Sequence, residues 1–198
     1  MKTLGIAVVM VVAAIALWAQ APPEGAAAAK GKAKAGRGVV EAKAPAPPTP
    51  PPVPQVLRLV RPNTYLVTGH GSNATFRVTP QGVILVNTKL PAAGDYERLV
   101  ELIRGITTQP VKFIFNTNAR PESNGNNAKF QGAEVVTTER TVTLGGAEAR
   151  SVRVGENTLV YFPSEKLLCL GDVSKTDAAV QKLEWTLAIP NSGEPVYR

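Results

Sequence analysis

Short runs of β-branched and aromatic residues alternate with turn residues from Val56 onward, and this pattern is typical of strands. Gly, Pro and Asn fill the breaks between the runs, where they favour tight turns. Because the breaks are short, consecutive strands are expected to pair as an antiparallel meander. The strands are predicted over residues 56–60, 64–68, 74–79 and 83–87.

The hydrophobic period then changes and predicts a helix over residues 95–105, since apolar residues recur at helical spacing from Leu99 to Ile106. The apolar run 110–115 predicts a buried strand that leads into the polar stretch 116–127. Strands separated by a helix favour an α/β layered fold with mixed β-sheets and flanking helices. Further strands are predicted over residues 134–137, 151–154, 158–162 and 167–170, and a short helix over 177–185.

The first 21 residues have the three parts of a secretory signal peptide. Lys2 gives a positive start, residues 4–18 are apolar, and Ala19-Gln20-Ala21 has the small residues of a cleavage site. An uncleaved membrane anchor is the alternative, but the apolar run is about 15 residues, short of the roughly 20 that span a bilayer. We therefore expect export, to the periplasm or the cell exterior.

Residues 22–55 are rich in Pro, Ala, Gly and Lys and predict a disordered linker, because such a segment cannot bury enough apolar surface to fold. Residues 56–198 then form one domain. Much of the formal charge of +7 falls before this domain, since residues 1–54 hold six of the 22 Lys and Arg but two of the 15 Asp and Glu. No aromatic residues are interleaved with these cations, so no nucleic-acid partner is expected. Membrane contact is expected only through the signal segment or the basic linker.

The counts of histidine and cysteine limit the chemistry. Zinc sites use three or four ligands drawn mainly from Cys, His and carboxylates, and the chain has one His and one Cys. Zinc catalysis of the usual kind is therefore nearly excluded. His70, in a Gly-rich turn, is expected to be a solvent-facing loop residue. Cys169, in an apolar run, is expected to be a small core residue, and no intramolecular disulfide can form.

Two segments carry motifs in a characteristic order. In residues 65–90 a Gly-rich turn with an Asn precedes an apolar strand, and in residues 108–117 a second strand runs into Asn116-Thr117. Together they resemble the metallo-β-lactamase-fold hydrolases over residues 56–173, which implies that family's layered α/β fold. In the family more of the second sheet follows, whereas about 25 residues remain here after Val173. The resemblance therefore implies a truncated fold, with a reduced sheet or an apolar face open to a protein partner or a second copy of the chain.

The family signature is Thr-His-x-His-x-Asp-His-x-Gly, and its first and last residues correspond to Thr117 and Gly125. The strand-end aspartate that precedes it corresponds to Asn87. The family's bridging aspartate corresponds to Asp172, and only this carboxylate keeps its identity. The other ligand positions hold different residues: Asn118, Arg120 and Ser123 at the three signature histidines, Glu122 at the aspartate and Arg153 at a further histidine.

The resemblance implies zinc, but these residues do not supply its ligands, so neither a cofactor nor a catalytic residue is expected. Arg120 and Arg153 are always charged, and if both point inward each can pair with Glu122 or Asp172. Three interpretations follow: a network that only stabilises the old cleft, a site for a small anion such as a carboxylate or phosphate, or residual hydrolysis with a metal on Asp172 and Glu122. We expect a non-catalytic binding or assembly module; the alternative is a metal-dependent ester or lactam hydrolase.

Overall fold

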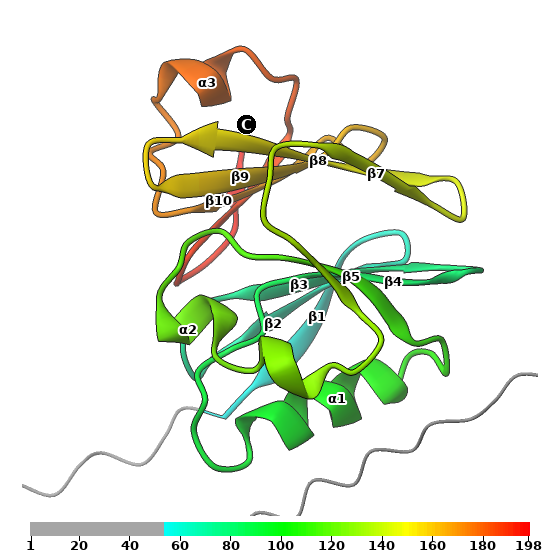
Figure 1. Ribbon diagram of the computed structural model, residues 1–198. Helices are drawn as coiled ribbons and strands as arrows, with labels where there is room; N and C mark the ends of the chain where they lie inside the picture. The colour runs from blue at the N-terminus through cyan, green and yellow to red at the C-terminus, as the bar shows by residue number, and fades with distance from the viewer. Residues whose placement is uncertain (1–53) are drawn as a thin grey trace, which may run out of the picture. The chain divides into compact units, whose positions relative to one another are not determined.

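The computed structural model describes residues 54–198, which form two stacked six-stranded sheets (Figure 1). In the first sheet β1 to β4 are antiparallel neighbours, and β5 and β6 continue parallel to β4. The predicted antiparallel meander is therefore confirmed. The strands are β1 (Val56–Arg61), β2 (Thr64–Thr68), β3 (Ala74–Thr79), β4 (Gly82–Val86), β5 (Val111–Phe115) and β6 (Glu134–Val136).

The second sheet has the order β12-β11-β10-β9-β8-β7 and is antiparallel except between β10 and β11. Both sheets are thus mixed, as the sequence predicted. The strand predicted over residues 151–154 is the last half of a longer strand, and β7, β11 and β12 were not predicted. The strands are β7 (Thr141–Leu144), β8 (Ala147–Val154), β9 (Asn157–Phe162), β10 (Leu167–Gly171), β11 (Leu187–Pro190) and β12 (Val196–Tyr197).

One long helix, α1 (Asp95–Arg104), covers the outer face of the first sheet (Figure 1). Its Leu99 and Ile103 are buried against Val83 and Leu85 of β4, so the predicted helical face is confirmed. The remaining helices are single turns: α2 (Pro121–Asn124), the 3-10 turn η1 (Asn127–Lys129) and α3 (Ala178–Gln181). The helix predicted over residues 177–185 is present but shorter, since only α3 is helical there. Asp177 caps it as expected, because its side chain accepts the Ala179 N–H at 2.8 Å.

The main core fills the space between the sheets. Residues that alternate along a strand point to opposite faces: in β4, Ile84 and Val86 face this core while Val83 and Leu85 face α1. Phe115 of the first sheet and Phe162 of the second are its largest members, both at most 1% exposed. Cys169 is 3% exposed in the same core, and burial raises the pKa of its thiol to about 12. This cysteine is the small core residue that the sequence predicted.

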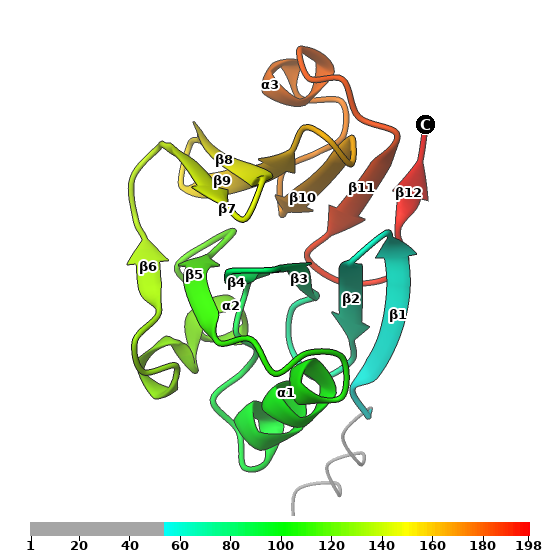
Figure 2. The ribbon, with the colours of Figure 1, turned by 90° about the vertical axis from the view of Figure 1, so that its right-hand side faces the viewer.

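The C-terminal segment completes the second sheet and does not leave it reduced. β11 pairs with β10, and the chain then returns beside β1 (Figure 2), where Arg58 and Glu194 form a bidentate ion pair at 2.5 and 2.9 Å. The outer face of the sheet is covered as well, because Val180 and Trp185 pack there in a buried cluster. The expectation of a reduced sheet or an open apolar face is therefore wrong. Among the described residues, the one helix that follows β10 is the four-residue α3.

The predicted signal peptide (1–21) and all but the end of the predicted linker (22–55) lie outside the described residues. Gln55, assigned to the linker from the sequence, is 5% exposed, and its amide donates to the Asp95 carbonyl oxygen at 3.0 Å. The folded domain therefore takes in Gln55. Within residues 54–198, no helix has the length and apolar character needed to cross a membrane.

The core between the sheets should dominate stability. Phe115→Ala removes a side chain that is 1% exposed and is expected to lower the free energy of unfolding by about 3–5 kcal/mol. Leu59→Ala is the matched control, because Leu59 is 64% exposed, and a change within about 0.5 kcal/mol is expected. Urea unfolding measures both; equal losses in the two variants would contradict this assignment of the core.

Candidate functional site

The two sheets touch where the loop after β5 meets the end of β10. Gly171 ends β10 with φ of 58°, and a Cβ on it would lie 2.6 Å from the Cβ of Thr117. Only glycine fits this close approach and this left-handed backbone. The contact brings Asp172 against the loop after β5. Four of the predicted site residues therefore lie together: Asn118, Arg120, Glu122 and Asp172.

Arg120 lies between two carboxylates. Its Nε is 2.9 Å from Glu122 Oε1, and its Nη2 donates to Asp172 Oδ2. Asn118 supports the same arrangement: its amide donates to Asp172 Oδ2 at 2.8 Å, and its Oδ1 accepts the Arg120 backbone N–H at 3.1 Å. The guanidinium therefore occupies the space between Asp172 and Glu122, the two carboxylates that the sequence suggested as metal ligands. The ion pairs are half-exposed, so each is expected to contribute about 1 kcal/mol or less to stability.

Ser123 is wholly buried at the third signature-histidine position. Its backbone carbonyl accepts the Thr88 N–H at 2.7 Å, and its hydroxyl lies 3.4 Å from Asn191 Oδ1. The site therefore includes Asn191, which follows β11 and which sequence reasoning missed because β11 itself was not predicted. A small side chain suits this packed position, whereas an imidazole would need room that the surrounding loops fill.

Asn87 uses both ends of its amide at the strand-end position. Its Nδ2 donates to the Asn73 carbonyl oxygen at 3.0 Å, and its Oδ1 accepts the Thr117 N–H at 2.9 Å. An aspartate could accept the second bond but could not donate the first. Its φ of 63° is one that asparagine adopts more readily than most residues. The amide thus joins three loops by hydrogen bonds at the position where the resemblance implied the strand-end aspartate.

Arg153 departs from the predicted network. It forms no ion pair with Glu122 or Asp172 within residues 54–198, so the pairing that was expected if both arginines pointed inward is made by Arg120 alone. Its backbone N–H donates to the Glu139 carboxylate, and its guanidinium lies 3.5 Å from the Thr137 carbonyl oxygen. The residue sits before the tight turn between β8 and β9, and this hairpin carries its side chain toward β6 and away from Asp172.

Arg153 instead lines a cavity of about 230 Å³ beside the ion pairs. Asn118 separates the two, because it lines the cavity and also binds Asp172. Amide and hydroxyl side chains share the wall with Ala119, Val135 and Val136, and the hairpin turn contributes one carboxylate. Its polar lining residues are Asn116, Asn118, Asn124, Asn127, Thr137, Arg153, Glu156 and Thr158.

His70 is not the solvent-facing loop residue that was expected. Its Nδ1 lies 2.5 Å from Asp95 Oδ1, and its side chain is 21% exposed. Asp95 is itself 5% exposed and also accepts a hydrogen bond from the Gln55 amide at 3.3 Å. The histidine therefore anchors the Gly-rich loop to the start of α1, and Arg120 and Asp172 are not among its contacts.

Lys89 is a buried cation that sequence reasoning missed. It is 0% exposed, and its Nζ donates to three carbonyl oxygens of the loop after β2: Val67 at 2.8 Å, Gly69 at 2.8 Å and Ser72 at 2.7 Å. Burial lowers the pKa of this ammonium to about 7, and the charge of Asp95 opposes the shift. The lysine holds the loop whose Ser72 contacts the Glu122 carbonyl. No sequence pattern distinguishes such a lysine from a surface one.

Among residues 54–198, no group of three His, Cys, Asp or Glu side chains lies close enough to hold a metal. Asp172 and Glu122 are the only carboxylates at the former ligand positions, and both bind Arg120. A metal there would have to displace a guanidinium that belongs to the same loop.

The fold is similar to solved metallo-β-lactamases. A metallo-β-lactamase from Pontibacter korlensis superimposes with a TM-score of 0.63 at 16% identity, covering 73% of this chain and 94% of that one. A metallo-β-lactamase from Cronobacter sakazakii, described by a HARLDQ motif, gives 0.55 at 13% identity, covering 68% and 77%. A stereoselective inverting sec-alkylsulfatase from Pseudomonas sp. gives 0.57 at 12% identity, covering 72% and 39%. No family model and no curated protein matches the sequence. The predicted fold is confirmed.

The burial of Lys89 should make stability depend on pH. Its pKa is about 7 in the folded chain against the ordinary 10.5, so between these values the unfolded chain holds more protons. Stability should therefore rise with pH across this window, with a slope of up to about 1.4 kcal/mol per pH unit from this residue. Urea unfolding at several pH values measures the slope, and Lys89→Met should lack this part of it. The same slope in both proteins would contradict the assignment.

Proposed function

We propose that this chain, which has the metallo-β-lactamase fold, is an exported binding module that performs no metal-dependent catalysis. The observation that carries the proposal is the guanidinium of Arg120 between Asp172 and Glu122. Residues 1–21 support export through their signal-peptide pattern.

The position of Arg120 works against any metal at Asp172. A histidine can lose a proton and then bind a metal through the free nitrogen. A guanidinium stays charged at all physiological pH values and has no such nitrogen to offer, so it repels a metal ion and cannot become its ligand. It is also tethered two residues from Asn118 and Glu122, and its local concentration therefore exceeds that of any free cation. Metal binding would cost these ion pairs and would place a dication beside a positive side chain.

The ligand of this module is a small anion bound at Arg153. Its guanidinium lines the 230 Å³ cavity and has no carboxylate partner among the described residues, although its backbone N–H does. The amide of Asn127 and the hydroxyl of Thr158 lie in the same wall and supply neutral hydrogen-bonding groups. A carboxylate or phosphate group suits this combination, because guanidinium pairs with planar or tetrahedral oxyanions. The carboxylate of Glu156 lies in the same lining and would repel an anion, so the ligand has to bind on the Arg153 side of the cavity.

A hydrolase remains the second candidate because of the Cronobacter protein. Its six-letter motif HARLDQ, laid on Asn118–Ser123, agrees with this chain at Ala119 and Arg120. A protein described as a metallo-β-lactamase therefore carries arginine at the same place. Its motif starts with histidine, however, where this chain has Asn118. The second candidate would use a metal held by Asp172 and Glu122 to hydrolyse an ester or lactam.

Restoring histidines should restore metal binding if Arg120 is what replaces the metal. In Asn118→His with Arg120→His, two imidazoles and Asp172 provide three ligands, and about one zinc per chain is expected after dialysis. The wild-type protein should retain none. The matched control is Arg98→His with Arg150→His, which adds two histidines at exposed positions away from Asp172. Elemental analysis gives the stoichiometry.

The same samples separate the two candidate functions. Stoichiometric metal in the wild-type protein, together with turnover of a chromogenic lactam or ester that Asp172→Ala abolishes, would overturn the non-catalytic proposal. Metal in the control variant would show that the added histidines bind without the Asp172 frame.

The anion site is tested with inorganic phosphate. Titration followed by NMR should give saturable shifts at the backbone amides of Asn127 and Thr158, and Arg153→Gln should weaken binding at least about fivefold, since charge-assisted hydrogen bonds are the strong ones. Arg150→Gln is the control, because Arg150 lies on the same strand but pairs with Glu148. Equal affinities in the two variants would rule out Arg153 as the anion-binding residue.

A further inference from the structure

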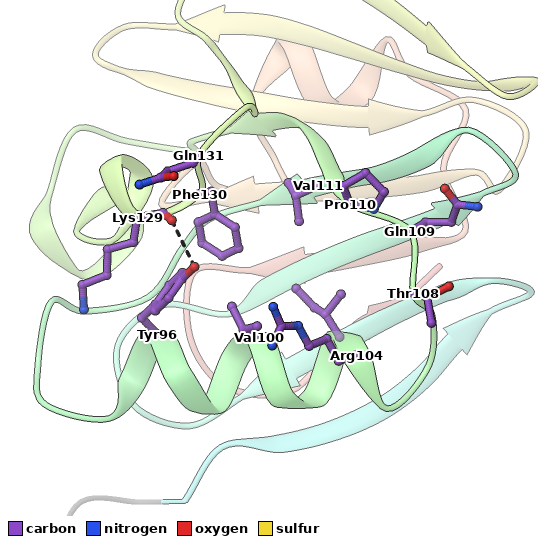
Figure 3. A pocket seen from close by; sticks show the side chains of 11 residues that line it. Tyr96, Val100, Arg104, Thr108, Gln109, Pro110, Val111, Lys129, Phe130 and Gln131 are labelled. Carbon is purple, nitrogen blue, oxygen red and sulfur yellow. Dashed lines mark hydrogen bonds between the residues drawn. The ribbon is translucent and has the colours of Figure 1, made fainter.

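A second hollow lies on the other side of the first sheet, between α1 and the segments that lead into β5 and follow η1 (Figure 3). Its volume is about 470 Å³, within the range of about 300–1,000 Å³ typical of small-molecule sites. The first sheet separates it from Arg120, Arg153 and Asp172. We call it the α1 groove, defined by Tyr96, Val100, Arg104, Val111 and Phe130.

The groove exists because one helix is too narrow for the sheet. An α-helix with its side chains is about 10–12 Å wide, whereas six strands about 4.8 Å apart extend over roughly 25 Å. The buried side chains of α1 pack in one cluster with residues of β2 to β4 and with Ile114 of β5, whereas Val111 of β5 and Val135 of β6 are only partly buried. Val100 and Val111 therefore form an apolar floor that the fold itself does not cover.

One end of the groove is closed by an aromatic pair. The rings of Tyr96 and Phe130 meet edge to face, with centroids 5.0 Å apart and an interplanar angle of 80°. The Tyr96 hydroxyl donates to the Lys129 carbonyl oxygen at 3.0 Å, a bond drawn in Figure 3 that fixes the ring. The wall is thus held in place before any ligand arrives, which reduces the entropy that binding would cost.

The charge at the groove comes from Arg104. Figure 3 shows its guanidinium lying along the mouth beside Val100, and no acidic residue lines the groove. Within residues 54–198, Arg104 forms no ion pair. Lys129 differs, because its ammonium lies over the Tyr96 ring at 5.1 Å and 3.9 Å from Glu97. The groove therefore offers an apolar floor and an aromatic end, and Thr108, Gln109 and Gln131 add polar groups to its wall. Besides Lys129, which lies beside Glu97, it offers the cation of Arg104.

We propose that the α1 groove binds a small apolar monocarboxylate, with its hydrocarbon body on Val111 and Phe130 and its carboxylate on Arg104. Charge complementarity selects the head group, because a guanidinium binds a carboxylate through two parallel N–H bonds. The uncovered apolar floor selects the body. This site is independent of the anion site at Arg153 and holds a different class of ligand.

Calorimetry with the full chain tests the site, using three ten-carbon probes that differ only in the head group. Decanoate should bind at about one per chain, decanol at least about fivefold more weakly, and decylamine weakest of all. Arg104→Gln should reduce decanoate affinity to that of decanol. Arg98→Gln, on the same helix but paired with Glu101, should leave decanoate binding unchanged.

Two further variants make the result specific to this groove. Val100→Glu places a carboxylate beside the floor and should abolish decanoate binding, while Arg153→Gln should not change it. The proposal would be overturned by decylamine binding as well as decanoate, by equal effects of the Arg104 and Arg98 substitutions, or by the absence of saturable heat. Loss of decanoate binding in Arg153→Gln would place the ligand in the other cavity and would also overturn it.

Discussion

The ion pairs of Arg120 connect the two halves of the site. Arg120 and Glu122 belong to the loop after β5 in the first sheet, and Asp172 follows β10 in the second. In a metal centre the shared ion would draw these loops together. Here the Arg120 side chain, which pairs with a carboxylate from each sheet, draws the loops together. Because each pair is half-exposed, the arrangement depends on several weak contacts and on the close approach of Gly171 to Thr117.

The surrounding positions follow the same chemistry. Asn87 stands at the position of the strand-end aspartate, and Asn118 and Ser123 stand at positions that the resemblance gave to histidines. Each makes directional hydrogen bonds to a neighbouring loop. An amide can donate and accept at once, so it satisfies backbone groups that a carboxylate could satisfy only in part. The loops are thus fixed by the protein's own donors and acceptors. Lys89 fixes the loop after β2 in the same way, because its ammonium donates hydrogen bonds to three carbonyl oxygens of that loop.

The sequence predicted the first sheet closely, because alternation and turn residues mark β2 and β3 at the residues observed. It also offered the pairing of Arg120 as one possibility, since this residue and Glu122 lie in one short motif, and the structure shows that pair. Arg153 could not be placed, because the direction of its side chain depends on the hairpin between β8 and β9. β11 was missed because Pro190 and the turn residues after it resemble a loop, and its pairing with β10 is a long-range contact. The burial of Lys89 likewise arises from loops distant in sequence.

The position of Cys169 decides when its thiol can be oxidised. Its thiol lies between the sheets and its pKa is raised to about 12, so almost none of it is the reactive thiolate at neutral pH. Oxidants and other thiols reach it only after the two sheets have separated. A mixed disulfide or a covalent dimer through this residue would therefore be a chemical record of unfolding, and the folded domain can pass through an oxidising compartment with its single thiol unchanged.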